Sequence, residues 1–184
     1  MKNLIKLLCI SFIIIGIILL SADKIYNYKQ IKINNNRVDE YFIKENKIKK
    51  DTYIGILEIP KIRLKRGFYD FNSIHNNINE NITILKPVMY PNDKNSIFIL
   101  AAHSGNSYIS YFKDLYKLDI NDDVYIYYKN KLYKYKIANY YEENKNGKIT
   151  IKDNSKKSKL ILTTCKNKNK QLIYIGHLKE VIDK

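Results

Sequence analysis

The amino-acid sequence predicts an all-β domain, either a sandwich or a barrel, that follows an N-terminal apolar helix. From Asp51 onward, short runs of β-branched and aromatic residues alternate with turn-forming residues, a pattern typical of such folds. The first 22 residues are instead almost entirely apolar. A chain of 184 residues is long enough for one sizeable hydrophobic core and short for two domains. We therefore expect one domain with an N-terminal tail.

The N-terminal segment, residues 1–22, is predicted to be a transmembrane signal anchor. Between Leu4 and Ala22 only Lys6 is charged, and a helix of about 20 apolar residues spans a bilayer. The small residues that end this run also suit a cleaved signal peptide, but the run is long for the apolar region of one. Lys2 and Lys6 favour a cytoplasmic N-terminus, so the rest of the chain is expected outside the cell, held in the cell membrane by a single pass.

Residues 23–50 are expected to form a stalk or linker. They are polar and asparagine-rich and contain neither proline nor glycine. A partly helical stalk and a disordered spacer both fit this composition. In either form the segment holds the folded domain, residues 51–184, away from the membrane.

Seven runs in this domain are predicted to be strands. The fourth and fifth runs alternate at period two around a polar pair, which predicts a β-hairpin. Residues 107–118 differ, because Phe112, Leu115 and Leu118 recur at helical spacing and predict one short helix. The strand runs are residues 53–59, 81–85, 96–102, 124–128, 131–138, 159–164 and 171–178.

The net charge of +15, from 33 basic and 18 acidic residues, raises the question of an anionic partner. Nucleic-acid readers rely on arginine forks, and the chain has only Arg37, Arg63 and Arg66. The lysine excess accompanies a general bias to Lys, Asn, Ile and Tyr. We therefore expect no nucleic-acid partner, and a solvated basic surface that can attract anionic polymers of a cell envelope. A basic envelope-binding module is one alternative function.

Cys165 and His103 are the candidate reactive residues. Cys9 lies in the predicted membrane segment, so Cys165 has no disulfide partner and no second cysteine for a zinc site in the exported part. Each of the two side chains follows a hydrophobic strand and precedes a polar loop. If those strands are neighbours, thiol and imidazole meet at one edge of the sheet, and such a pair suffices for acyl transfer through a thioester. A cysteine that is simply buried is the alternative.

Other patterns that carry chemistry are weak. His75 lies in a polar run and is expected in a loop, and His177 is expected to be structural. The sequence has no glycine-rich phosphate loop and no CxxC pair, and its acidic clusters lack the ordered spacing of a calcium loop. We expect neither a cofactor nor a metal ion.

Three segments of the chain resemble the sortases, the membrane-anchored cysteine transpeptidases of Gram-positive bacteria. They are YIGILEIPKIRLKRGFYD (residues 53–70), SIFILAAHSGNSYISYFKDLYKL (96–118) and LILTTCKNKNKQLIYIGHL (160–178). The resemblance implies an eight-stranded β-barrel with its active site in a groove at one rim. It also implies cleavage of an LPXTG-like sorting signal between Thr and Gly. The implied partners are surface proteins that carry such signals, and an amine of peptidoglycan or of a pilin that accepts the acyl group.

The resemblance also assigns roles to single residues. Cys165 is the implied nucleophile, and His103 is the implied general acid and base. Two departures from the family pattern are mild, since Ile161 replaces a threonine of the cysteine strand and alanine replaces the glycine that commonly precedes the histidine. The expected substrate-binding residues are Ala102, Ser104, Thr164 and Lys170.

The main departure concerns the third catalytic residue, an arginine that opens the last strand in the family. Gln171 occupies that position with Lys170 beside it, and no arginine follows Arg66. An amide can donate one hydrogen bond to an oxyanion, whereas losing such a donor costs a factor of about 10² to 10³ in rate. Lysine supplies charge without the bidentate fork. The chain is then a slower enzyme, an enzyme that recruits Arg63 or Arg66, or a protein that binds sorting signals without cleaving them; alternatively Gln171 simply begins a strand.

Overall fold

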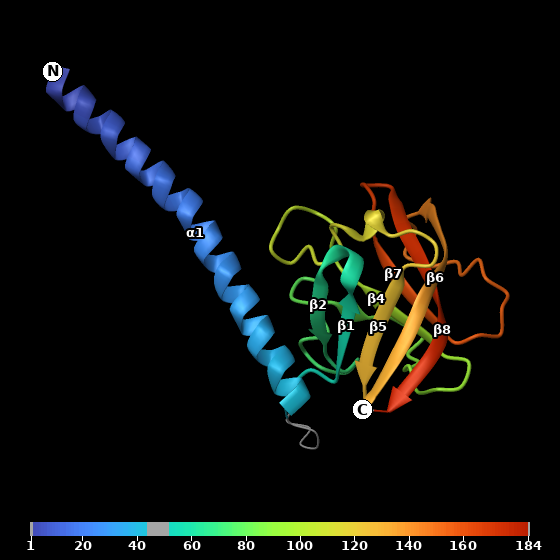
Figure 1. Cartoon of the computed structure of the whole chain (residues 1–184). Helices are drawn as coiled ribbons and strands as arrows, with labels where there is room; N and C mark the ends of the chain where they lie inside the picture. Colours follow the sequence, from blue (N-terminus) through green and yellow to red (C-terminus); the bar gives the residue numbers. More distant parts are fainter. Residues whose placement is uncertain (1, 44–51, 184) are drawn as a thin grey trace. The chain divides into compact units, whose positions relative to one another are not determined.

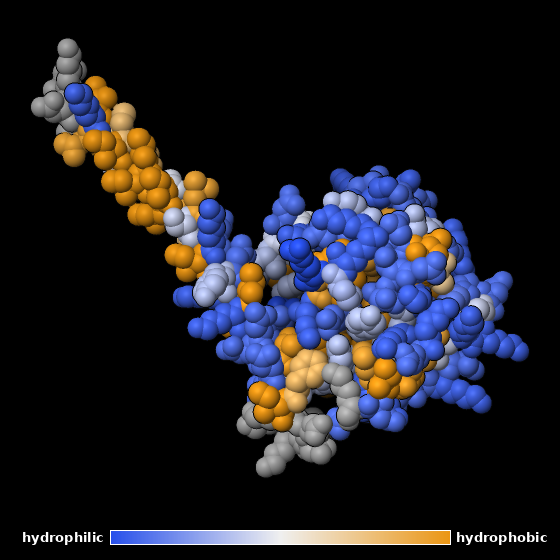
Figure 2. Space-filling view, viewed as in Figure 1, coloured by the Kyte–Doolittle hydropathy of each residue, from blue (hydrophilic) through white to orange (hydrophobic). Residues whose placement is uncertain are grey.

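The computed structural model describes residues 2–43 and 52–183, and the chain divides into two compact units, Met1–Asn36 and Arg37–Lys184. Helix α1 (Lys2–Ile43) begins in the first unit (Figure 1). Its large apolar side chains between Ile5 and Leu20 are exposed, and they form the continuous apolar surface of this segment in Figure 2. By length and composition the helix is able to cross a membrane.

The predicted stalk is helical over the residues that belong to α1. The helix continues from the apolar segment without a break as far as Ile43. The last part of the predicted stalk, residues 44–50, and the predicted start of the domain at Asp51 lie outside the described residues. The division of the chain into an anchor, a stalk and a domain stays a prediction.

The second unit contains one sheet of eight strands, which Figure 1 shows wrapped into a barrel. Two short 3-10 helices, Pro60–Ile62 and Leu115–Lys117, lie in its connections. The strands are β1 (Gly55–Ile59), β2 (Leu64–Phe68), β3 (Thr83–Ile84), β4 (Ile97–Ala101), β5 (Asp123–Tyr128), β6 (Lys131–Asn144), β7 (Lys159–Cys165) and β8 (Lys170–Asp183).

The strand order is β2-β1-β5-β6-β8-β7-β4-β3, and all neighbours are antiparallel except β4 and β7, which are parallel. A parallel bridge between Phe68, at the end of β2, and Ile82, just before β3, links the two edges of the sheet. The sheet is therefore a nearly closed mixed barrel. This confirms the predicted all-β class and the eight-stranded barrel.

Each of the seven predicted runs overlaps a strand, and the predicted hairpin joins β5 to β6. Lys129 and Asn130 form its turn with φ values of 48° and 57°, the positive values that a type I′ turn requires. The remaining strand, β2, was not among the predicted runs. Its five residues include Lys65 and Arg66 and do not show the apolar alternation of a strand, although the buried pairing with β1 makes it one.

The segment predicted to be a short helix, residues 107–118, is a series of turns with a single regular 3-10 turn at Leu115–Lys117. Its helical spacing still predicts burial correctly, because Phe112, Leu115 and Leu118 are all at most 1% exposed and belong to the main core. The segment therefore closes over the core rather than standing on the surface as a separate helix.

The strands that carry the candidate residues have two buried faces. On β7, Leu160 and Leu162 belong to the main core, which receives side chains from all eight strands, whereas Ile161 belongs to a second cluster. Because side chains alternate along a strand, Cys165 lies on the face of Ile161. Burial of each isoleucine in this cluster contributes roughly 1.5–3 kcal/mol, so the face is firmly held. We call the cluster the outer cluster, and it consists of Ile99, Ile161, Ile173 and Ile175.

Candidate active site

The one parallel pairing of the sheet brings the ends of the strands that precede His103 and Cys165 to the same edge. Strands β4 and β7 pair in register, with Ala101 opposite Thr163 as the last pair. Continued by two residues beyond Ala101, where β4 ends, this register aligns His103 with Cys165. Parity along β4 puts His103 on the face of the outer cluster, as it does Cys165 on β7. The strand register therefore brings both residues to the same edge of the sheet, and contact between imidazole and thiol stays a prediction.

Two hydrogen bonds tie the ends of these strands together. The Thr164 hydroxyl donates to the carbonyl oxygen of Ala102 at 2.7 Å, and the Ser104 hydroxyl donates to the carbonyl oxygen of Cys165. Thr164 and Ala102 are buried, so they fix the strand ends from inside the barrel. Ser104 is partly exposed and fixes the backbone of the cysteine itself. Contact of these three residues with a substrate stays a prediction.

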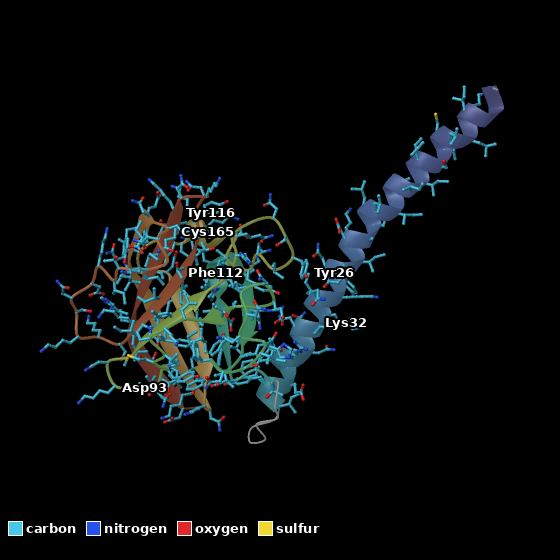
Figure 3. The ribbon with its side chains drawn as sticks, turned by 180° about the vertical axis from the view of Figure 1, so that it is seen from behind. Tyr26, Lys32, Asp93, Phe112, Tyr116 and Cys165 are labelled. Atoms are coloured by element: carbon cyan, nitrogen blue, oxygen red, sulfur yellow. The ribbon has the colours of Figure 1, made fainter. Side chains whose placement is uncertain are left out.

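The Cys165 thiol is partly exposed and forms no disulfide, and Cys9 is an exposed free cysteine in α1. Figure 3 shows Cys165 at the end of the barrel that also carries Tyr116, opposite the end with Asp93. The thiol is therefore at a rim of the barrel and partly open to solvent. This position differs from that of a cysteine buried in the core.

The His103 ring is held by a hydrogen bond at Nε2. This atom lies 3.1 Å from the side-chain oxygen of Asn79 in the β2–β3 connection. An amide oxygen can only accept, so in this contact Nε2 carries the hydrogen and Nδ1 is the second ring nitrogen. The backbone of His103 is also held, since Phe112 N–H donates to its carbonyl oxygen at 2.9 Å.

Gln171 lies directly opposite Cys165 in the β7–β8 pairing and opposite Glu143 in the β6–β8 pairing. Its side-chain amide donates to Glu143 Oε1 at 2.8 Å and to the backbone oxygen of Lys148 at 2.7 Å. The amide has two hydrogens, so both are used in these contacts. A third hydrogen bond to an oxyanion would require one of them to break.

The β6–β7 connection, residues 145–158, covers the outer cluster next to this site. Ile149 and Ile151 pack against the cluster, and Thr150 N–H donates to Glu143. Glu143 and Gln171 together therefore hold the near end of the connection. We call residues 145–152 the site wall.

We expect the Gln171→Leu change to loosen the site wall. The variant loses both amide hydrogen bonds, each worth about 1 kcal/mol, so amides of residues 148–152 should exchange with solvent roughly tenfold faster. Hydrogen exchange with mass spectrometry measures this. Asn169→Leu, an exposed change in the adjoining β7–β8 turn, is the control. Unchanged exchange in the Gln171 variant would show that the amide does not hold the wall.

A partly buried hydrogen bond between His177 and Asp153 holds the far end of the β6–β7 connection. His177 Nε2 bonds the Asp153 carboxylate, and the two side chains are 16% and 11% exposed. Burial raises the pKa of Asp153, but hydrogen bonds from His177 and Ser155 together outweigh this and lower the pKa to about 2. His177 is thus a structural histidine, as its sequence position predicts.

The Asp153→Asn change should lower the free energy of unfolding by about 1 kcal/mol near neutral pH. Because the folded-state pKa of Asp153 is below its ordinary value of 3.8, its stabilisation is present above about pH 4 and is lost as the pH falls toward 2. Denaturant unfolding followed by circular dichroism should therefore show wild type and variant converging over that window. Asp183→Asn, which removes an exposed pair with Lys131, should cost less than about 0.5 kcal/mol. A difference that persists unchanged at pH 2 would contradict the assignment.

The remaining candidates have other partners. Lys170 lies 3.6 Å from Glu142, whose pKa is lowered by hydrogen bonding to Lys166 and by the charges of both lysines. Arg63 caps the first 3-10 helix in a left-handed conformation. His75 Nδ1 lies 3.2 Å from Glu80 in the β2–β3 connection.

Arg66 is buried beneath the turn that contacts His103. It donates from Nε to the side-chain oxygen of Asn81 at 2.9 Å, and its guanidinium lies 4.2 Å from the centre of the Tyr111 ring. Asn79 was not among the residues predicted from the sequence. Its contact with His103 joins residues 24 positions apart, so the local sequence pattern contains no signal for it.

Among residues 2–43 and 52–183, no three His, Cys, Asp or Glu side chains gather as metal ligands.

Comparisons with known proteins bear on this arrangement. The family model described as Sortase domain matches residues 57–179. The solved Sortase D5 transpeptidase of Clostridium perfringens is similar with a TM-score of 0.66 and 18% identity, over 81% of this chain and 99% of that chain. Sortase C-3 of Streptococcus pneumoniae is similar with a TM-score of 0.65 and 17% identity, over 86% of this chain and 84% of that chain. Sortase A of Listeria monocytogenes is similar with a TM-score of 0.61 and 18% identity, over 73% of this chain and 92% of that chain. A comparison with curated proteins finds no match.

Proposed function

Because the chain belongs to the sortase family, we propose that it is a cysteine transpeptidase that cleaves an LPXTG-like sorting signal through a thioester. The observation that carries this proposal is the parallel pairing of β4 and β7, whose register aligns His103 with Cys165. The two residues share the face of the outer cluster at a rim of the barrel. A nucleophile and a general acid-base are thus supplied by adjacent strand ends.

The proposed reaction has two acyl transfers. The Cys165 thiolate attacks the carbonyl carbon of the Thr–Gly bond, and collapse of the tetrahedral intermediate breaks the C–N bond. His103 gives a proton to the departing glycine amine, which leaves the N-terminal part of the substrate as a thioester. An acceptor amine then attacks the thioester, gives a proton to His103, and releases the thiolate. The product is a new amide bond to a cell-wall or pilin amine.

The oxyanion of each intermediate lacks the arginine that the family resemblance implies. Gln171 occupies that position, and a role for its amide as an oxyanion donor stays a prediction. Both of its hydrogens are donated to Glu143 and Lys148, which favours a role in holding the site wall. We therefore expect turnover that is slower than with an arginine, by up to about 10² to 10³.

The same observation favours a second candidate function, a sorting-signal binder that does not cleave. Such a protein would use the surface around Cys165 and the site wall for recognition and would have lost stabilisation of the oxyanion. It differs from the first candidate in one outcome, because it binds peptide without forming a thioester.

We further propose that α1 anchors the chain in the cell membrane and that the barrel faces the cell wall. The exposed apolar surface of α1 between Ile5 and Leu20 supports membrane insertion. The surface proteins and amines that carry and accept sorting signals are outside the cytosol, so an exported barrel meets both. Fluorescence of a tag at either end of the chain, with and without permeabilisation, tests this orientation.

The proposed activity is tested with the full chain in detergent and a panel of LPXTG-like peptides, with and without an oligoglycine amine. The expected product joins the peptide, cut after Thr, to the added amine, as identified by tandem mass spectrometry. Peptide binding without any product would favour the second candidate. Neither binding nor cleavage across the panel would overturn both.

A further inference from the structure

We propose that Asn79 is a positioning residue for His103, which completes a cysteine–histidine–asparagine arrangement; this assignment rests on the proposed function. The side-chain oxygen of Asn79 accepts the Nε2 hydrogen of His103 at 3.1 Å. This contact selects the Nε2–H tautomer of the neutral ring. It leaves Nδ1 to receive a proton from the thiol or amine and to return it.

The turn that presents Asn79 is held by hydrogen bonds among residues 77–81, without help from His103. Asn77 organises it, because its side-chain oxygen accepts Asn79 N–H at 3.0 Å and its backbone oxygen accepts the N–H groups of Glu80 and Asn81 at 2.9 Å. The backbone of Asn79 is therefore fixed by local hydrogen bonds. Its exposed side chain is then free to serve His103 rather than the turn.

The turn and the His103 loop are also linked to each other. Arg66 donates to Asn81 at 2.9 Å and stacks on Tyr111, and the Tyr111 hydroxyl donates to the carbonyl oxygen of Glu80 at 3.2 Å. The next residue, Phe112, donates its N–H to the carbonyl oxygen of His103. The contacts therefore form a closed ring from the histidine through the turn and back.

These contacts explain what the buried side chain of Arg66 does. Arg66 is 9% exposed, and within the described residues it makes no ion pair with a carboxylate. Its hydrogen bond is made to Asn81 in the turn, and its aromatic contact is made with Tyr111. Arg66 therefore supports the position of Asn79 indirectly, through its hydrogen bond to Asn81 at the end of the turn.

A residue that orients the imidazole affects the rate because the rate depends strongly on where the reacting groups lie. A misplacement of a reacting group by about 1 Å can cost about 10²-fold. Histidines in unrelated acyl-transfer enzymes are also oriented by an asparagine or aspartate, there through Nδ1 with Nε2 reacting, whereas here the two ring nitrogens exchange these parts. With an amide in place of the arginine, the orientation of the imidazole carries a larger part of the remaining rate.

The test compares Asn79→Leu, which removes the acceptor, with Asn79→Asp, which keeps one, in the full chain in detergent. Asn72→Leu, an exposed change in the same connection, is the control. We expect Asn79→Leu to lower kcat for thioester formation by about 10- to 100-fold with KM nearly unchanged, and Asn79→Asp to restore most of it. Long-range ¹H–¹⁵N spectra of histidine-labelled protein should show the His103 proton on Nε2 in the wild type and on both nitrogens in turn in Asn79→Leu.

Two results would overturn the assignment. One is an Asn79→Leu variant that keeps both its kcat and the Nε2–H tautomer. The other is an Asn79→Asp variant as impaired as Asn79→Leu, because an acceptor at this position would then have no effect. If the wild type forms no thioester, the proposed function fails, and the tautomer spectra alone then decide whether Asn79 orients His103.

Discussion

Replacing Cys165 by alanine is expected to abolish cleavage of the sorting-signal peptide, with a loss of at least about 10⁴-fold in rate. The thiol is the only cysteine of the barrel, and no other nucleophile lies opposite His103 in the β4–β7 register. Cleavage measured by chromatography of the peptide products gives the rate. Binding of the peptide, measured by fluorescence anisotropy, should be nearly unchanged because the side chain is small.

The matched control for this change is Cys9→Ala. Cys9 is the second free cysteine of the chain and lies in α1, outside the barrel. The control should keep full activity. Thiol alkylation at Cys165 should inactivate it at the same rate as the wild type. A Cys165→Ala variant that still cleaves the peptide would show that the reaction proceeds without a covalent thioester.

The His103→Gln change is expected to slow thioester formation by about 10² to 10⁴-fold. Glutamine keeps a polar side chain of similar length, but it neither takes the proton from the thiol nor gives one to the leaving amine. Single-turnover mixing with acid quench measures this step directly. The effect should be on the rate of the chemical step rather than on peptide binding.

His75→Gln is the control for the histidine change. His75 contacts Glu80 at 3.2 Å in the β2–β3 connection and has no place in the proposed reaction. Its variant should retain activity within about threefold. A His103→Gln variant with the wild-type rate would remove the general acid and base from the account.

Most of the barrel could be predicted because its strands alternate apolar and polar residues or are continuously apolar. β2 could not, since Lys65 and Arg66 interrupt its pattern and its burial comes from pairing with β1. The segment before β5 shows the opposite case. Its spacing of Phe112 and Leu115 correctly predicts which residues are buried, although the backbone forms turns with only one regular 3-10 turn.

The site separates into what local sequence holds and what the fold adds. The positions of His103 and Cys165 at the ends of apolar strands are local features, whereas the parallel pairing that brings these ends to one edge is added by the fold, since antiparallel neighbours would separate them. The partners of Gln171 and the contact of Asn79 with His103 depend on loops that come from distant parts of the chain. Composition and spacing contain no signal for such contacts, because loop residues of the same types occur throughout this sequence.

The central claim is that Cys165 forms a thioester with a sorting signal. Intact-mass spectrometry of the full chain after acid quench tests it most directly, with an LPXTG-like peptide and the Cys165→Ala variant beside the wild type. The expected result is a mass increase equal to the peptide fragment that ends in Thr, present on the wild type and absent from the variant. Peptide that binds the wild type but leaves its mass unchanged at every quench time would contradict the claim.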